Sequence, residues 1–236
     1  PIEILQCITI TTNGTICIEQ PEIINMLRKI YALRISVEGH TNKQQSFVRG
    51  IPLENVINHA LFYKKKKIPI WIRITMTCQN WEHLLDETLP YYINLGFLNF
   101  QIYEFQAVGR GKYNIDKLAV NDDIFVLFLE KLKIWRSFYG KVGLHLKFMF
   151  SSIRQELICS YKEQLEQNNL KVENISKGNG LSIHADGSVY LCAWDNEENH
   201  CILNVYEEDF SQTTLQLRQM NLTHKCNHCS TICITY

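Results

Sequence analysis

The sequence lacks long apolar runs and an excess of either charge. No stretch reaches the roughly 18 consecutive apolar residues that a membrane span requires, and no signal peptide opens it. Lysine and arginine together number 24, as do aspartate and glutamate, so the basic footprint of a nucleic-acid-binding protein is missing. We therefore expect a cytoplasmic protein with no nucleic-acid or membrane partner.

Cysteine is abundant, yet the sequence lacks the marks of a disulfide scaffold. Its nine cysteines are an odd number, and disulfide frameworks belong mostly to small secreted chains. With 236 residues, 46% of them hydrophobic, the chain can bury a large core without cross-links. We therefore interpret the cysteines as metal ligands, buried thiols or catalytic thiols.

Short apolar runs alternate with helical patterns up to about residue 170. Helical stretches begin at Pro21, cover residues 53–61 and 84–89, where Pro90 should kink or break the helix, and span Asp122–Tyr139 after a cap at Asn121 or Asp122. Nearly continuous apolar runs are typical of buried strands, and repeated strand–helix units predict an α/β fold with parallel strands. The predicted strands are Ile4–Thr12, Ala32–Val37, Ile68–Thr77, Phe97–Phe105 and Leu144–Phe150.

The character of the chain changes after Leu170. Leu181–Ala185 and Ser188–Cys192 flank Asp186-Gly187, which predicts a β-hairpin with a type I′ turn. Four thiolates that include a C-x2-C pair suit one [4Fe–4S] cluster or a tetrahedral zinc, and nearby histidines keep zinc open. We predict two domains, residues 1–170 and 171–236. The four candidate metal ligands are Cys192, Cys226, Cys229 and Cys233.

Five stretches, in order, resemble the core of radical S-adenosylmethionine (SAM) enzymes after its first two strands. They are similar to the family's TNG strand end, its RISLDG strand, the RG that follows, the next strand, and the GR after the sixth strand. The hairpin and late cysteines resemble the family's SPASM or shortened twitch domain, through Gly187 to Cys192 and Cys226 to Cys229. The five stretches are Ile8–Thr15, Leu33–His40, Phe47–Gly50, Ile68–Thr75 and Ala107–Gly111.

The resemblance implies a partial (β/α)6 TIM-like barrel that lacks its first strands, followed by a small cysteine-containing β-hairpin/α domain. Ligands bind at the carboxyl ends of such strands. Ser36 and Glu38 are two residues apart and point to one face, and Arg49 or Arg73 could hold a carboxylate. Ser36 and Glu38 could equally form a polar barrel interior and Arg73 an ordinary ion pair. The implied SAM-binding residues are Asn13, Ser36, Glu38, Arg49, Arg73 and Gly109.

The sequence departs from the family at two motifs. The C-x3-C-x2-C triplet that holds the radical SAM [4Fe–4S] cluster is absent, since Cys7 and Cys17 cannot supply it. The glycine-rich motif that binds the SAM amino group is also absent. We expect that an N-terminal part of the parent protein is missing and that this chain alone is inactive; a decayed pseudoenzyme is the alternative.

The resemblance further implies radical-based modification of a peptide or protein, with SAM and one auxiliary [4Fe–4S] cluster as cofactors. Flavodoxin or ferredoxin would deliver the electron. Family members with this domain epimerise peptides, form thioethers or mature sulfatases, and Cys78, just past a strand end, could donate a hydrogen atom or be a buried small side chain. The rival hypothesis is a non-catalytic peptide-binding scaffold with a structural zinc or iron–sulfur site.

Overall fold

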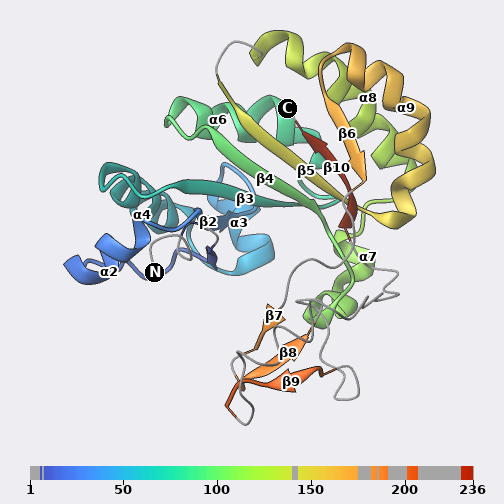
Figure 1. Ribbon diagram of the computed structural model, residues 1–236. Coiled ribbons are helices and arrows are strands. Elements are labelled where there is room, and N and C mark those ends of the chain that lie inside the picture. Colours follow the sequence, from blue (N-terminus) through green and yellow to red (C-terminus); the bar gives the residue numbers. More distant parts are fainter. Residues whose placement is uncertain are drawn as a thin grey trace.

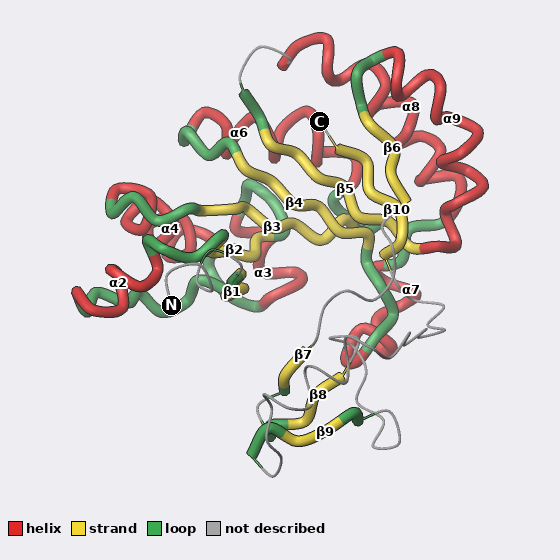
Figure 2. The backbone as a smooth tube through the Cα atoms, viewed as in Figure 1, coloured by secondary structure: helices red, strands yellow, loops and turns green. Residues whose placement is uncertain are grey.

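The computed structural model describes residues 6, 8–139, 143–174, 182–184, 186–190, 201–206 and 230–235. They form a seven-stranded sheet and a separate three-stranded sheet, shown in Figures 1 and 2. The large sheet has the order β1-β2-β3-β4-β5-β10-β6, and β1 to β5 are parallel. Its strands are β1 (Thr9–Thr12), β2 (Ala32–Val37), β3 (Ile70–Met76), β4 (Asn99–Glu104), β5 (His145–Ser151), β6 (Lys171–Asn174) and β10 (Ser230–Thr235).

Helices pack against one face of the large sheet and bury the main core. Alternate strand residues such as Ile35, Ile72, Ile102 and Phe148 are 0% exposed in this core, which follows from the two-residue repeat of a strand. The helices are α2 (Pro21–Leu27), α3 (Asn42–Arg49), α4 (Leu53–Lys65), α5 (Trp81–His83), α6 (Leu89–Asn94), α7 (Ile115–Leu118), α8 (Asp122–Tyr139) and α9 (Gln155–Gln167).

The predicted strands and helices of the first 174 residues are largely confirmed. All five predicted strands occur, and α8 has the predicted bounds. Asn121 caps α8, because its Oδ1 accepts a hydrogen bond of 2.8 Å from the Ile124 N–H.

The helix predicted around residue 84 differs from a simple kink at Pro90. A π-helix, η1 (Leu84–Thr88), separates α5 from α6, and Pro90 lies in the first turn of α6. Pro90 lacks an N–H to bond the preceding turn, and the Leu85 carbonyl instead accepts a hydrogen bond of 2.6 Å from the Trp135 indole N–H. The wider turn of the π-helix thus takes the place of the predicted break.

The small sheet contains β7 (Ser182–Ile183), β8 (Ser188–Tyr190) and β9 (Leu203–Asn204). The hairpin is confirmed, but its predicted type I′ turn is wrong. A type I′ turn joins two strands through two residues, whereas here the His184 N–H bonds the Ser188 carbonyl and three residues lie between them. Gly187 has φ 84°. The Gly187 N–H instead bonds the His184 carbonyl, as in a longer loop with a left-handed glycine.

The chain returns to the large sheet after the small one. Strand β10 pairs antiparallel with both β5 and β6, so residues on both sides of position 170 share one sheet. The two-domain division at 170/171 stays a prediction. No described helix is long and apolar enough to cross a membrane.

Candidate functional site

The carboxyl ends of β2 and β3 bring four of the predicted residues together. Ser36 lies beside Arg73 in the parallel register of the two strands. Glu38 follows β2 directly, and Arg49, at the end of α3, returns to it: Arg49 Nε lies 2.7 Å from Glu38 Oε1. The prediction that these side chains share one site is therefore consistent with the geometry.

The Glu38 carboxylate is the buried centre of this group, with 1% of the residue exposed. It accepts hydrogen bonds from Arg49 and from the Thr75 N–H, the latter at 3.2 Å. Burial raises the pKa of the Glu38 carboxyl above its ordinary value, although the Arg49 guanidinium acts in the opposite direction. Arg49 is thus engaged by the protein's own acid.

Arg73 faces a cavity at the ends of β3 and β4. Its guanidinium carbon lies 4.5 Å from the centre of the Tyr103 ring, a cation–π contact. Burial lowers the pKa of Arg73, and the nearby Arg34 charge contributes in the same direction. The cavity measures about 200 Å³ and is also lined by Thr75 and Gly111.

Gly109 begins the 3₁₀ helix η2 (Gly109–Asn114) beside this cavity, with φ 53°. Its neighbours Val108 and Gly111 line the cavity wall. A side chain on Gly111 would meet the Gln106 carbonyl oxygen at 2.8 Å, so the lack of a side chain lets these two backbone segments pack closely beside the cavity.

Asn13 does not join the Glu38 group. Its Oδ1 accepts bonds from the Thr15 N–H and hydroxyl at 3.2 and 2.8 Å, which closes the turn after β1, and the residue is exposed. Its contact with a cofactor stays a prediction.

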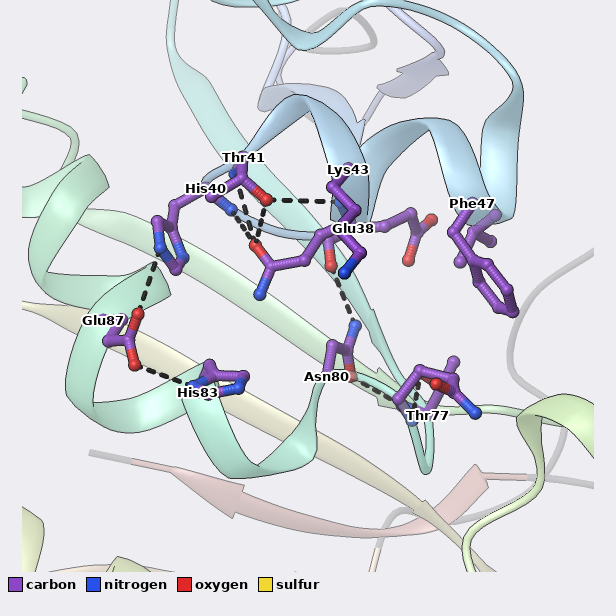
Figure 3. Close-up of a pocket in the computed structure, with 12 residues that line it drawn as sticks. Glu38, His40, Thr41, Lys43, Phe47, Thr77, Asn80, His83 and Glu87 are labelled. Carbon is purple, nitrogen blue, oxygen red and sulfur yellow. Dashed lines mark hydrogen bonds and ion pairs between the residues drawn. The ribbon is translucent and has the colours of Figure 1, made fainter.

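A second cavity of about 330 Å³ lies between α3 and the π-helix (Figure 3), and we call it the α3 pocket. Asn80 forms its floor, because its side-chain amide donates to the Glu38 and Thr75 carbonyls. Phe47, 58% exposed, and Lys43 stand on the α3 side. This pocket combines an apolar wall with polar groups, as small-ligand sites do.

Two histidines on the rim of the α3 pocket share one carboxylate. His40 Nε2 lies 3.2 Å from Glu87 Oε2, and His83 Nδ1 lies 2.7 Å from Glu87 Oε1 (Figure 3). Sequence reasoning did not single out these residues. The four-residue spacing of His83 and Glu87 could have signalled their contact, but the return of His40 from β2 is a tertiary effect.

Cys78 follows β3, as predicted, and its thiol donates to the Lys117 carbonyl at 3.1 Å. This contact directs the sulfur toward α7 rather than the α3 pocket, whose lining includes Gln79 and Thr77. Hydrogen donation by Cys78 stays a prediction.

The predicted metal quartet falls mostly outside the described residues. Cys192, Cys226 and Cys229 lie there, whereas Cys233 lies in β10, 4% exposed. Burial raises the pKa of the Cys233 thiol to about 11. Among the described residues no three His, Cys, Asp or Glu side chains could hold a metal, so the quartet stays a prediction.

No protein-family model and no curated protein matches the chain. Solved structures match over most of its length. They include native anSMEcpe with bound AdoMet (SAM) and Cp18Cys peptide, with TM-score 0.59 and 17% identity, covering 90% of this chain and 57% of that one.

A second match is Streptococcus suis SuiB bound to precursor peptide SuiA, with TM-score 0.63 and 16% identity, covering 94% of this chain and 52% of that one. SuiB bound to S-adenosylmethionine also matches, with TM-score 0.60 and 16% identity, over 87% and 47%. The chain thus spans about half the length of the solved chains. It has the fold of these SAM-bound and peptide-bound proteins, as the radical SAM resemblance of its sequence predicts.

Proposed function

We propose that the chain is the SAM-binding and auxiliary-cluster part of a radical SAM enzyme that modifies a peptide or protein. The observation that carries the proposal is the shared fold over 90% of the chain with a structure that holds both AdoMet and a peptide. The five family-like stretches add to it, because four residues from three of them meet at the ends of β2 and β3.

The residues at the strand ends fit SAM. Ser36, 4% exposed, provides a hydroxyl for the ribose, and Arg73 provides a cation for the methionyl carboxylate. Glu38, held by Arg49 and Thr75, keeps negative charge near the SAM amino group. Gly109 and Gly111 let the backbone approach the rest of the cofactor, and Asn13 is proposed to contact it from β1.

When bound beside a reduced [4Fe–4S] cluster, SAM supplies a radical that abstracts a substrate hydrogen. The proposal requires a C-x3-C-x2-C triplet from residues outside this sequence, and an electron donor such as flavodoxin or ferredoxin. An auxiliary [4Fe–4S] cluster on Cys192, Cys226, Cys229 and Cys233 would accept an electron or anchor the substrate. Cys78 would donate a hydrogen atom only after breaking its contact with Lys117.

Three reaction types suit this proposal: peptide epimerisation, thioether formation and sulfatase-type maturation. Anaerobic incubation of the natural polypeptide with SAM, a reductant and candidate peptides tests them. Formation of 5′-deoxyadenosine with an unchanged peptide mass indicates epimerisation. Loss of two hydrogens together with loss of a free cysteine thiol indicates a thioether, and a new aldehyde that reacts with hydroxylamine indicates sulfatase-type maturation. If the natural polypeptide lacks the C-x3-C-x2-C triplet and forms no 5′-deoxyadenosine, the proposal of a radical SAM enzyme is rejected.

A second candidate function is a peptide-binding scaffold with a structural metal. Anaerobic purification separates the candidates: a brown protein whose iron content matches one cluster supports the enzyme, and a colourless protein that contains zinc supports the scaffold.

A further inference from the structure

The face of the large sheet opposite the helices carries polar side chains in register. We call it the polar face and define it by Arg34, Arg73, Gln101, Lys147 and Cys233. Arg73 pairs with Gln101, and Gln101 with Lys147, so these three side chains lie side by side across β3, β4 and β5.

Lys147 connects separate strands on the polar face. Its ammonium reaches across β4 to lie 5.5 Å from the centre of the Trp71 ring on β3. Trp71 in turn pairs with Arg34 on β2. Arg34 is therefore the strand neighbour of Trp71, and Lys147 contacts the ring of Trp71 from β5.

The polar face holds more positive charge than its acids balance. Among the described residues, Glu38 is paired with Arg49, and Glu173 with Lys171. No described ion pair involves Arg34, Arg73 or Lys147. The cation–π contacts with Tyr103 and Trp71 compensate Arg73 and Lys147 only in part, so half-buried cations without an acid favour an anionic ligand.

Two buried polar atoms on this face have no hydrogen-bond partner among the described residues. They are Arg34 Nε, a donor, and Gln101 Oε1, an acceptor. Gln101 is only 5% exposed, and buried amides are almost always hydrogen-bonded. A ligand that satisfies both atoms must carry an acceptor for Arg34 Nε and a donor for Gln101 Oε1.

We propose that the polar face binds an acidic side chain of the peptide substrate, with its carboxylate between Arg34 and Lys147 and a neighbouring peptide N–H donated to Gln101 Oε1. This rests on the proposed function, because it assigns a substrate class to that protein. A peptide offers carboxylate and N–H together, and Trp71 provides an apolar floor for the acidic side chain's methylene groups.

The test is binding of the full chain to an array of peptides in which every acidic sequence has a copy with Gln and Asn for Glu and Asp. We expect binding to acidic members and its loss in the neutral copies. Arg34→Gln and Lys147→Gln should each weaken that binding about tenfold or more, because hydrogen bonds to charged groups are lost. Lys65→Gln, on the exposed surface of α4, is the charge-matched control and should leave it unchanged.

Gln101→Glu is a second variant that does not depend on weakened folding. It places a carboxylate between Arg73 and Lys147, so it should raise the thermal midpoint and abolish binding of acidic peptides. A lowered midpoint with peptide binding intact overturns the proposal.

SAM affinity, measured on the same variants, separates the two hypotheses. If Arg34→Gln and Lys147→Gln weaken SAM binding, and SAM displaces acidic peptides, the polar face binds SAM. That result would overturn this inference alone. Equal binding of acidic and neutral peptides overturns it as well. If the chain has no affinity for SAM but binds acidic peptides in a way that depends on Arg34 and Lys147, the inference is supported and the proposed function is rejected.

Discussion

Glu104 and Arg154 form the most buried ion pair among the described residues, with side chains 5% and 7% exposed. Arg154 Nε lies 2.7 Å from Glu104 Oε1, and the guanidinium also contacts Asp122 and the Val120 carbonyl. Arg154→Met leaves the carboxylate of Glu104 buried without its cation. We expect a loss of about 3–5 kcal/mol in the free energy of unfolding, measured by urea titration.

Adding Glu104→Gln to Arg154→Met should recover part of that loss, because the unpaired charge disappears. An Arg154→Met protein as stable as the wild type would contradict the buried network.

Glu38 should make stability depend on pH. Its pKa is raised in the folded protein from the ordinary value of 4.5, chiefly by burial. The folded state therefore holds this proton more tightly, and its contribution is present below pH 4.5 and is lost as the pH rises through the raised pKa. We expect the wild type to lose stability relative to Glu38→Gln over that window, in urea titrations at stepped pH. A stability difference that is constant, or that moves the other way, would contradict the assignment.

The positions of single residues were predictable where those residues lie in or directly after a predicted strand. Ser36 and Glu38 follow from the position of β2, and Arg73 from β3. The partner of Arg49 did not follow, because the loop and α3 that bring it back to Glu38 set that contact through tertiary packing. His40 and Glu87 were missed for the same reason.

At the scale of elements, the turn after β1 depends on Gly14. It has φ 70°, and an added Cβ would meet Val56 Cγ1 at 2.9 Å. Gly50, with φ 65° and nothing within 4 Å, is a matched control. At both positions we expect alanine to lower the free energy of unfolding by about 1–2 kcal/mol, because the backbone is left-handed. At Gly14 the clash should lower it by about 1–3 kcal/mol more.

Denaturant unfolding of Gly14→Ala and Gly50→Ala measures this difference. Equal losses would show that α4 does not pack against the turn.

The apolar strands and α8 were predictable because their periodicity is strong and local. Strand β10 was not, because its sequence STICIT follows a cysteine pattern that reads as a metal motif. Only its pairing with β5 and β6 reveals a strand. The π-helix was equally hidden, since it shares the apolar spacing of an α-helix.

Strand β10 should protect its cysteine from reagents. The Cys233 thiol is buried with a pKa of about 11, whereas Cys159 on α9 is exposed. Because the thiolate is the nucleophile, a maleimide at neutral pH should label Cys159 far faster than Cys233, as read by peptide mass spectrometry. Rapid labelling of Cys233 in the folded protein would contradict its place inside the sheet.

At the scale of the whole molecule, one face of the large sheet builds the core and the polar face carries charged strand side chains. The helices and the alternate apolar residues such as Ile72 and Phe148 account for the fold. On the polar face, Arg73 and Lys147 contribute little to that core and instead present positive charge on either side of the Gln101 amide. The parallel α/β arrangement was predictable from the sequence. The excess of positive charge on the polar face could be recognised only from the register of the strands.

SAM binding tests the central claim most directly. Equilibrium dialysis of labelled SAM should be done with this chain and with any longer natural polypeptide that contains it, comparing wild type with Arg73→Met. Saturable binding of one SAM per chain, weakened about tenfold by Arg73→Met, is the predicted result. Absence of saturable binding in both polypeptides, or binding that Arg73→Met leaves unchanged, would contradict the account.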